Sequence, residues 1–125
     1  KDIKGELNGM ARRGEVFRTA GNRIYDFEPG FEYVAVNTLI QGSAADHTKR
    51  ALLNIDDMLN TKYSGDARIM LTIHDEFMIS GHKKLEKSLM KEFKEAMEYD
   101  ELFDLPMLTD GNTGRYWGKM NEYKD

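Results

Sequence analysis

The sequence predicts an α+β fold in which a small antiparallel sheet is covered on one face by helices. Two short apolar runs meet within Ile69–Ser80, and about five residues on each side of a polar joint predict a β-hairpin there. Helical periodicity over Phe31–Asn60 and again over Lys83–Tyr99 predicts the helices. A chain of 125 residues is long enough for one domain with one modest core.

The first thirty residues predict the end of a helical region followed by a hairpin. Residues 1–13 are polar and read as the tail of a helix. Within residues 14–28, the β-prone runs Glu15–Thr19 and Arg23–Phe27 are separated by Ala20-Gly21-Asn22, which is a turn sequence. The residues Glu28-Pro29-Gly30 are expected to end this hairpin.

The two predicted helices carry apolar stripes that indicate which face each one buries. In the long helix over residues 31–60, Gly42 is expected to bend or weaken the helix locally. Its buried stripe is Leu52, Ile55 and Leu59. The second helix, over residues 83–99, repeats an apolar residue every four positions: Leu85, Leu89, Phe93 and Met97. This spacing favours core packing over a cofactor site.

The remaining segments predict turns and one more strand. Residues 62–66 predict a turn before the hairpin at residues 69–80. Leu105–Thr109 predicts a final strand whose start is set by Pro106, within a C-terminal segment over residues 105–119. Gly111-Asn112 is expected to form a turn. We expect this C-terminal strand to join the central hairpin in one small sheet.

Composition limits the function classes without choosing among them. The chain has no cysteine, which excludes disulfides and cysteine–zinc sites and fits a cytosolic protein. No run approaches the ~20 apolar residues of a membrane span, and no signal-peptide pattern is present. With 18 basic and 22 acidic residues the net charge is −4, which is unlike a free-standing DNA-binding protein. The acidic excess lies around Met97–Asp104.

His74, Asp75 and Glu76 are the strongest candidates for chemistry. Ionisable residues at the joint of an apolar hairpin are costly unless they face a cleft, a metal or a partner. Neighbouring carboxylates suit Mg²⁺, which prefers oxygen ligands. Asp75 is the predicted direct ligand, with Glu76 beside it if the joint is a tight turn. The alternative is a solvated acidic turn.

Asn37 and Gln41 form a second candidate site. They are four residues apart on the long helix and therefore share a face, which Ala45 and Thr48 are expected to continue. Amide donors can bind the acceptors that every base pair offers in the minor groove, whatever the sequence. The alternative reading makes both amides ordinary surface residues. His47 and His82 have no ligand partners at a suitable spacing and read as surface residues.

Together these segments resemble the C-terminal part of the palm domain in family A, or DNA polymerase I-like, DNA polymerases, and most closely the phage versions. NTLIQGSAAD at Asn37–Asp46 is similar to the family's N-x-x-x-Q-G-[ST]-A-A-D helix, and the strand ending in His-Asp-Glu is similar to its motif C. GEVFRTAGNRIYDF at Gly14–Phe27 resembles its hairpin before the helix. Gly114 and Trp117, as G-x-x-W-G within Met107–Gly118, resemble its C-terminal end.

The resemblance implies template-directed nucleotidyl transfer from dNTPs to a primer 3′-hydroxyl with two Mg²⁺ ions. It implies that Asp75 and Glu76 are catalytic, with Asp75 holding metal. It also implies contacts to primer–template DNA, for which the residues are Asn37, Gln41, His74 and Arg23. Gly21-Asn22-Arg23 departs from the usual G-R-R, which puts the phosphate contact of the first arginine in doubt. The implied location is the cytoplasm of a bacterium or of a phage-infected host.

The other parts that such an enzyme needs are not found in these 125 residues. We find no motif A strand, which carries the second essential aspartate, and no fingers helix for the incoming dNTP; residues 1–13 would be the end of the fingers or a connector. Lys1 in place of Met is typical of a piece of something longer. The chain is therefore expected to be inactive alone, with motif A, fingers and thumb supplied in cis or by a second chain.

Two other classes of function stay open. A metal-dependent nuclease or phosphohydrolase would also use clustered carboxylates, but it usually needs a third or fourth ligand on the same surface. A non-catalytic α+β interaction module would have no need of His-Asp-Glu at a hairpin joint.

Overall fold

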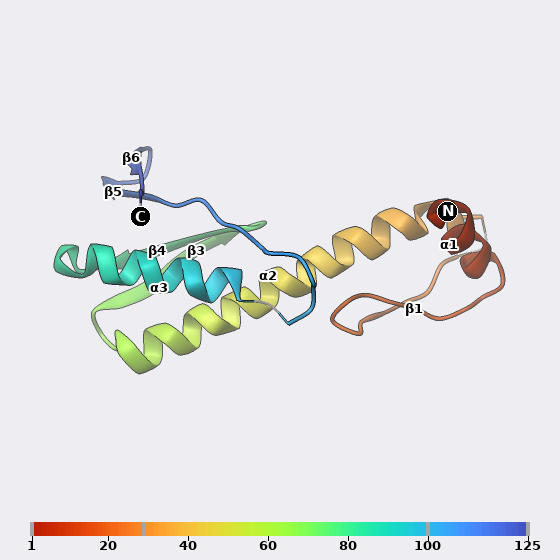
Figure 1. The fold of residues 1–125 in the computed structure, drawn as a ribbon, viewed down its shortest axis with the longest axis horizontal. Coiled ribbons are helices and arrows are strands. Elements are labelled where there is room, and N and C mark those ends of the chain that lie inside the picture. Colours follow the sequence, from red (N-terminus) through yellow and green to blue (C-terminus); the bar gives the residue numbers. More distant parts are fainter. Residues whose placement is uncertain (1, 29, 100, 125) are drawn as a thin grey trace. The chain divides into compact units, whose positions relative to one another are not determined.

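The structure is a computed structural model that describes residues 2–28, 30–99 and 101–124 (Figure 1). The chain divides into two compact units, Lys1–His47 and Thr48–Asp125, and each is described by itself. Helix α2 (Ala35–Lys62) contributes residues to both units. Pro29, which was expected to help end the hairpin, lies outside the described residues, as does Lys1.

The first unit confirms the predicted helix end and hairpin. Helix α1 (Ile3–Arg12) is capped by the Asp2 carboxylate, which accepts a hydrogen bond from the Gly5 N–H at 3.0 Å. Strands β1 (Phe17–Arg18) and β2 (Ile24–Tyr25) pair antiparallel, and both are shorter than the predicted runs. A 3₁₀ turn, η1 (Glu32–Val34), then leads into α2.

Gly42 allows the β1–β2 hairpin to lie directly on α2. A Cβ at Gly42 would stand 2.7 Å from Thr19 Cγ2 and 3.1 Å from the Tyr25 ring, closer than side chains pack. Helix α2 runs unbroken through Gly42 for 28 residues, and the expected local bend or weakening stays a prediction. The absence of a side chain at Gly42 permits this close approach between two elements.

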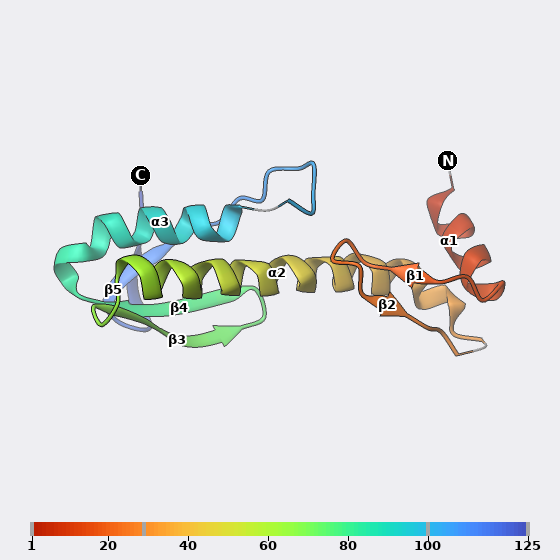
Figure 2. The same cartoon turned by 90° about the horizontal axis from the view of Figure 1, so that it is seen from below.

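The second unit packs a hairpin and two helices around one core. Strands β3 (Ala67–Ile73) and β4 (Glu76–Gly81) form the predicted hairpin, and η2 (Lys83–Leu85) leads into α3 (Glu86–Glu98). Figure 2 shows α3 running beside the second half of α2. The core consists of Ala51, Ile55, Met58, Leu59, Tyr63, Phe77, Leu89, Met90 and Phe93. Both predicted apolar stripes contribute to it or pack against it.

The β3–β4 hairpin contains a β-bulge that determines the length of its turn. Ile69 pairs with Ile79, but the next pair is Leu71 with Met78, so Met70 is an extra residue on β3. Beyond the bulge the pairing continues to Ile73 and Glu76. Only two residues therefore remain to connect the strands.

The C-terminal segment differs from the prediction. Leu105–Thr109 forms no strand: Pro106 has no N–H to donate, and the Thr109 N–H and hydroxyl both bond to the Glu98 carboxylate at 2.8 and 2.9 Å. The strands lie later, at β5 (Asn112–Tyr116) and β6 (Lys119–Glu122).

These two strands form their own hairpin and do not join β3–β4. Gly111-Asn112 is not a turn, because Asn112 begins β5 and the Gly111 carbonyl accepts the Tyr123 N–H at 2.8 Å. The described residues form an α+β fold with three separate two-stranded antiparallel sheets. The class predicted from the sequence is confirmed. Among the described helices, none is long and apolar enough to cross a membrane.

Candidate functional site

His74 and Asp75 are the two turn residues that connect β3 to β4, and Glu76 begins β4 opposite Ile73. His74 has a φ of +54°, in the left-handed region that two-residue hairpin turns use. Histidine enters this region more readily than most residues other than glycine. The joint is therefore a tight turn, which was the condition for Glu76 to lie beside Asp75.

All three side chains of this turn are exposed to solvent. They make no side-chain hydrogen bond or ion pair with another described residue, so none of their polar atoms is used to hold the fold together. Three ionisable residues at the tip of a hairpin thus remain available to a ligand. The apolar strands behind them fix the place from which they project.

The donor set at this turn fits Mg²⁺ in kind but is incomplete in number. Asp75 and Glu76 offer carboxylate oxygens, which are hard ligands of the type that this ion prefers. Nowhere in the described residues do three or more histidine, aspartate or glutamate side chains gather in a way that could hold a metal ion. Asp75 could therefore supply one part of a ligand set, and the rest would come from phosphates, water or other carboxylates.

Asn37 and Gln41 lie on a solvent-exposed face of α2. Ile40 and Ala44 are exposed on the same face, whereas Ala45, which was expected to continue it, is half-buried. Gly42, Ser43 and Asp46, which lie toward the β1–β2 hairpin, are buried. In the first unit α2 therefore has one face fixed by the hairpin and another open to a partner.

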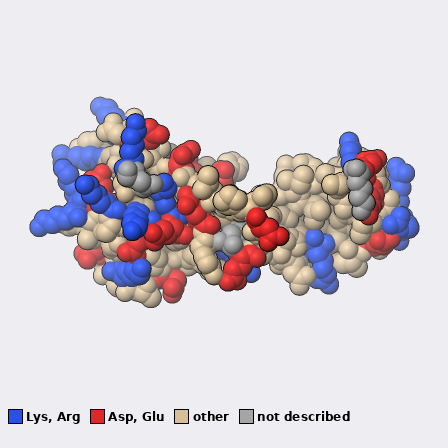
Figure 3. Space-filling view, viewed as in Figure 1, with Lys and Arg blue, Asp and Glu red and all other residues tan. Residues whose placement is uncertain are grey.

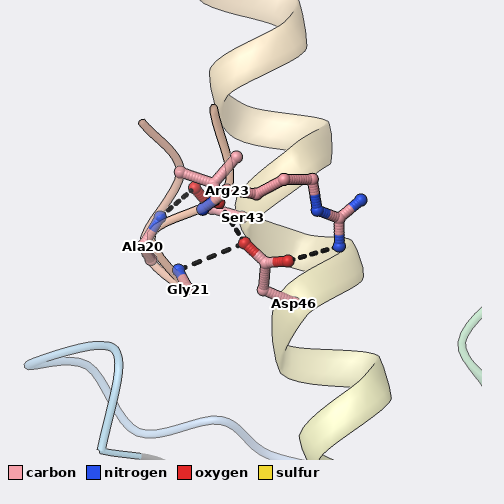
Figure 4. A network of polar contacts seen from close by, with 6 residues as sticks. Ala20, Gly21, Arg23, Ser43 and Asp46 are labelled. Atoms are coloured by element: carbon pink, nitrogen blue, oxygen red, sulfur yellow. Dashed lines mark hydrogen bonds and ion pairs between the residues drawn. The ribbon is translucent and has the colours of Figure 1, made fainter. Parts of the chain in front are cut away.

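Asp46 is the centre of a polar network that the sequence analysis did not anticipate (Figure 4). Its side chain is only 9% exposed. One carboxylate oxygen accepts the Thr19 hydroxyl and, at 3.1 Å, the Gly21 N–H, while the other accepts an Arg23 N–H at 2.5 Å. Nearby, the Ser43 hydroxyl accepts the Ala20 N–H at 3.0 Å. The sequence held one indication of this network: Ser43 and Asp46 are polar residues three positions apart on the buried side of a helix.

This network satisfies every backbone N–H from Thr19 to Arg23. Asn22 N–H donates to the Thr19 carbonyl, Arg23 N–H donates to the Thr19 hydroxyl, and Thr19 N–H donates to the Arg23 carbonyl. A Cβ at Gly21 would stand 2.6 Å from the Asp46 carboxyl carbon, so the loop approaches α2 as closely as a glycine allows. We call residues Thr19–Arg23 the anchored loop.

The electrostatics of the anchored loop favour the ionised form of Asp46. Burial acts to raise the pKa of Asp46, but the hydrogen bonds from Thr19 and Gly21 and the charge of Arg23 outweigh it and hold this pKa below its ordinary value. Arg23 was predicted to contact DNA. That contact stays a prediction: the Arg23 guanidinium is paired with Asp46 within the chain, and its side chain is 36% exposed.

Charged side chains of both signs lie on the face of the molecule that Figure 3 shows. On the face shown in Figure 3, basic and acidic side chains are interspersed among the coloured atoms and form no continuous basic stripe on that face. The lack of a basic stripe on that face agrees with the net charge of −4.

A family model described as DNA polymerase family A matches residues 4–119. The chain belongs to this family. Three curated relatives are similar over nearly all of it: DNA polymerase I of Borreliella burgdorferi (33% identical over 94% of the chain), of Bacillus subtilis (32% over 91%) and of Pseudomonas aeruginosa (32% over 89%). The chain spans 13% of the length of each of these family A relatives.

Among solved structures, the chain is similar to the POL domain of Pol1 from M. smegmatis, in a complex with DNA primer–template and dNTP. The match has a TM-score of 0.71 and 27% identity, and it covers 84% of this chain and 20% of that one. The family resemblance drawn from the sequence motifs is thereby confirmed.

Proposed function

We propose that this chain is part of a DNA-directed DNA polymerase that extends a primer 3′-hydroxyl with dNTPs on a DNA template. The observation that carries the proposal is the exposed His74-Asp75-Glu76 turn, within a family A chain matched over residues 4–119. The M. smegmatis neighbour, which is bound to primer–template and dNTP, supports the same partners. The fingers, the thumb and motif A would come from elsewhere in the protein or from a second chain.

In this proposal the turn is the family's motif C and supplies one side of the catalytic centre. Asp75 would hold Mg²⁺ through its carboxylate, and Glu76 would contribute negative charge beside it. Bound Mg²⁺ would supply Lewis-acid chemistry for nucleotidyl transfer to the primer hydroxyl. His74 contacts the primer end next to the metal ligand. The hairpin positions all three side chains because only two residues connect its strands.

The exposed face of α2 holds the duplex. Asn37 and Gln41 donate hydrogen bonds to minor-groove acceptors that are shared by all base pairs, so their contribution does not depend on sequence. A mispair displaces those acceptors, and these two amides would then help to sense it. Arg23 contributes chiefly by holding the anchored loop, and a phosphate contact from its exposed edge stays a prediction. The cytoplasmic location and the phage-like character also stay predictions.

A nuclease or phosphohydrolase site built wholly from this chain receives less support. Such a site usually gathers three or four acidic or histidine ligands, and the described residues contain no such group. The incomplete ligand set fits a shared catalytic centre better.

The test is Asp75→Ala in the full-length protein. We expect single-turnover primer extension to fall by far more than tenfold while primer–template affinity and folding stay near those of the parent, because Asp75 makes no contact that supports the fold. Glu76→Ala should have a milder effect. Asp56→Ala, which removes an exposed aspartate from α2, is the matched control and should change neither property. Extension by the Asp75 variant within tenfold of the parent would disprove the metal role.

A further inference from the structure

The β1–β2 hairpin carries two arginines, of which one forms an ion pair and the other does not. The Arg23 guanidinium is paired with the buried Asp46 carboxylate. Arg18, which is exposed, hydrogen-bonds only to uncharged acceptors: its NH1 group donates to the Asn22 carbonyl at 3.3 Å and to the Asn22 side-chain oxygen at 3.0 Å. Arg18 forms no ion pair with any described residue. Of the two charges, only that of Arg18 is uncompensated.

Asn22 holds this charge in a defined orientation. Its φ is +66°, in the left-handed region that asparagine tolerates better than most side chains. Both of its oxygen acceptors bind the same guanidinium nitrogen, and the loop beneath is fixed to α2 through Ser43 and Asp46. Because the side chain is already ordered, less rotamer freedom remains to be lost when a ligand binds.

The atoms that Asn22 leaves unused are suited to a phosphate. A guanidinium is a planar fork of five N–H donors, and pairs of them match two oxygens of a phosphate or carboxylate. With NH1 turned toward Asn22, the Nε and the other amino group remain for a ligand. The ligand that suits this group is an anion, because Arg18 forms no ion pair with a described residue.

We propose that Arg18 is a further phosphate-binding residue for the primer–template backbone and that Asn22 is the residue that positions it. The proposal rests on the proposed function, which supplies a polyanionic ligand for this family A chain. In this proposal Arg18 contacts the DNA backbone beside the anchored loop, which Arg23 holds in place through Asp46.

The test is primer–template binding by the full-length protein over a range of salt concentrations. Each phosphate contact contributes about 0.9 to the slope of log affinity against log salt. Arg18→Ala should lower the affinity about tenfold near physiological salt and reduce the slope by roughly one. Arg18→Lys keeps the charge but loses the planar fork, so it should weaken binding and leave the slope nearly unchanged. Gln41→Ala, a groove contact, should weaken binding without changing the slope.

Two substitutions at Asn22 separate orientation from folding. Asn22→Gly suits the left-handed conformation and removes the side-chain acceptor, so it should weaken binding several-fold with an unchanged slope. Asn22→Asp places a carboxylate against Arg18 and should reproduce the lower slope of Arg18→Ala. Both variants keep the turn, and thermal unfolding of the full-length protein should confirm it.

The outcomes are distinct. If the parent protein neither binds primer–template nor extends it, the proposed function fails. If the parent does both, and the slopes of Arg18→Ala and Asn22→Asp stay equal to its slope, the phosphate contact is disproved. A lower unfolding temperature for Arg18→Ala, with unchanged DNA binding, would mean that the Arg18–Asn22 hydrogen bonds only stabilise the fold, which also overturns the proposal.

Discussion

Asp46 and Asp75 are aspartates of one chain with opposite surroundings. Asp46 is buried and accepts hydrogen bonds from a hydroxyl, a backbone N–H and a guanidinium. Asp75 is exposed and bonds to no other described side chain. A carboxylate whose acceptors are all used stabilises a fold, whereas one whose oxygens are free can bind a cation. The residue type alone does not distinguish the two, and only Asp75 was identified from the sequence.

The lowered pKa of Asp46 makes the anchored loop sensitive to acid. A carboxylate with a folded-state pKa below its unfolded value of about 3.9 contributes stability that is complete above that value and lost as the pH falls through the folded-state pKa. We therefore expect the Gly21 amide to lose protection from hydrogen exchange below about pH 4. In Asp46→Asn, protection should be weaker by about 2 kcal/mol at neutral pH and should not change with acid. Equal pH dependence in the two proteins would contradict this account.

At the scale of elements, the first half of α2 has one face packed against the β1–β2 hairpin and another exposed to solvent. The hairpin occupies the face of Gly42, Ser43 and Asp46, and Asn37 and Gln41 remain open on another. The anchored loop prevents the hairpin from sliding along the helix. The face with Asn37 and Gln41 therefore belongs to a helix whose opposite side is hydrogen-bonded to the anchored loop through Ser43 and Asp46.

Gly42→Ala tests the close approach of the hairpin to α2. Alanine raises helix propensity by about 1 kcal/mol, but its Cβ would overlap Thr19 and Tyr25, at a cost of about 1–3 kcal/mol. We expect a net loss of about 1 kcal/mol in the free energy of unfolding. Gly9→Ala on α1 is the control, because its Cβ would meet only the end of the long, exposed Arg13 side chain, at 3.2 Å, and it should stabilise the protein. Stabilisation by both substitutions would show that the hairpin is not held closely. Thermal unfolding measures both.

Elements that depend on local periodicity could be predicted from the sequence, and those that depend on partners could not. The stripe of Leu85, Leu89, Phe93 and Met97 predicted α3 because helical spacing alone decides which face is buried. Leu105–Thr109 has strand-like residues, but the Glu98 carboxylate takes the hydrogen bonds that a neighbouring strand would have used. At the site, the tight turn at Asp75 was anticipated, whereas the Asp46 network required knowledge of which hairpin packs on α2.

At the scale of the whole molecule, apolar surface remains exposed on the second unit. Met70, Leu71 and Ile73 of β3 are 53%, 40% and 37% exposed, and the β3–β4 sheet has only two strands. An unpaired strand edge with apolar side chains is a template for association. In the proposed polymerase, the motif A strand would cover this surface.

The 125-residue chain alone is therefore expected to be marginally folded or self-associating, and inactive with Mg²⁺, primer–template and dNTPs. Sedimentation and thermal unfolding test the first part, and primer extension tests the second. A monodisperse monomer with a sharp transition above ~65 °C would contradict the expectation and favour a self-sufficient subunit. The full-length protein, studied in parallel, is the control for activity.

The bulge on β3 decides which residues form the turn at the tip of the β3–β4 hairpin. With Met70 bulged out, the strands close over His74 and Asp75; in a regular ladder with the pairing of Ile69 and Ile79, the connection would centre on His74 alone and span three residues. The position of Asp75 in the turn thus depends on the number of residues between Ile69 and the tip, as well as on its neighbouring side chains. Deleting Met70 would leave a regular ladder that closes over the same two residues, His74 and Asp75. Any other insertion or deletion between the paired residues would move the turn unless a bulge absorbed it. A substitution at position 70 leaves the number of residues, and therefore the turn, unchanged.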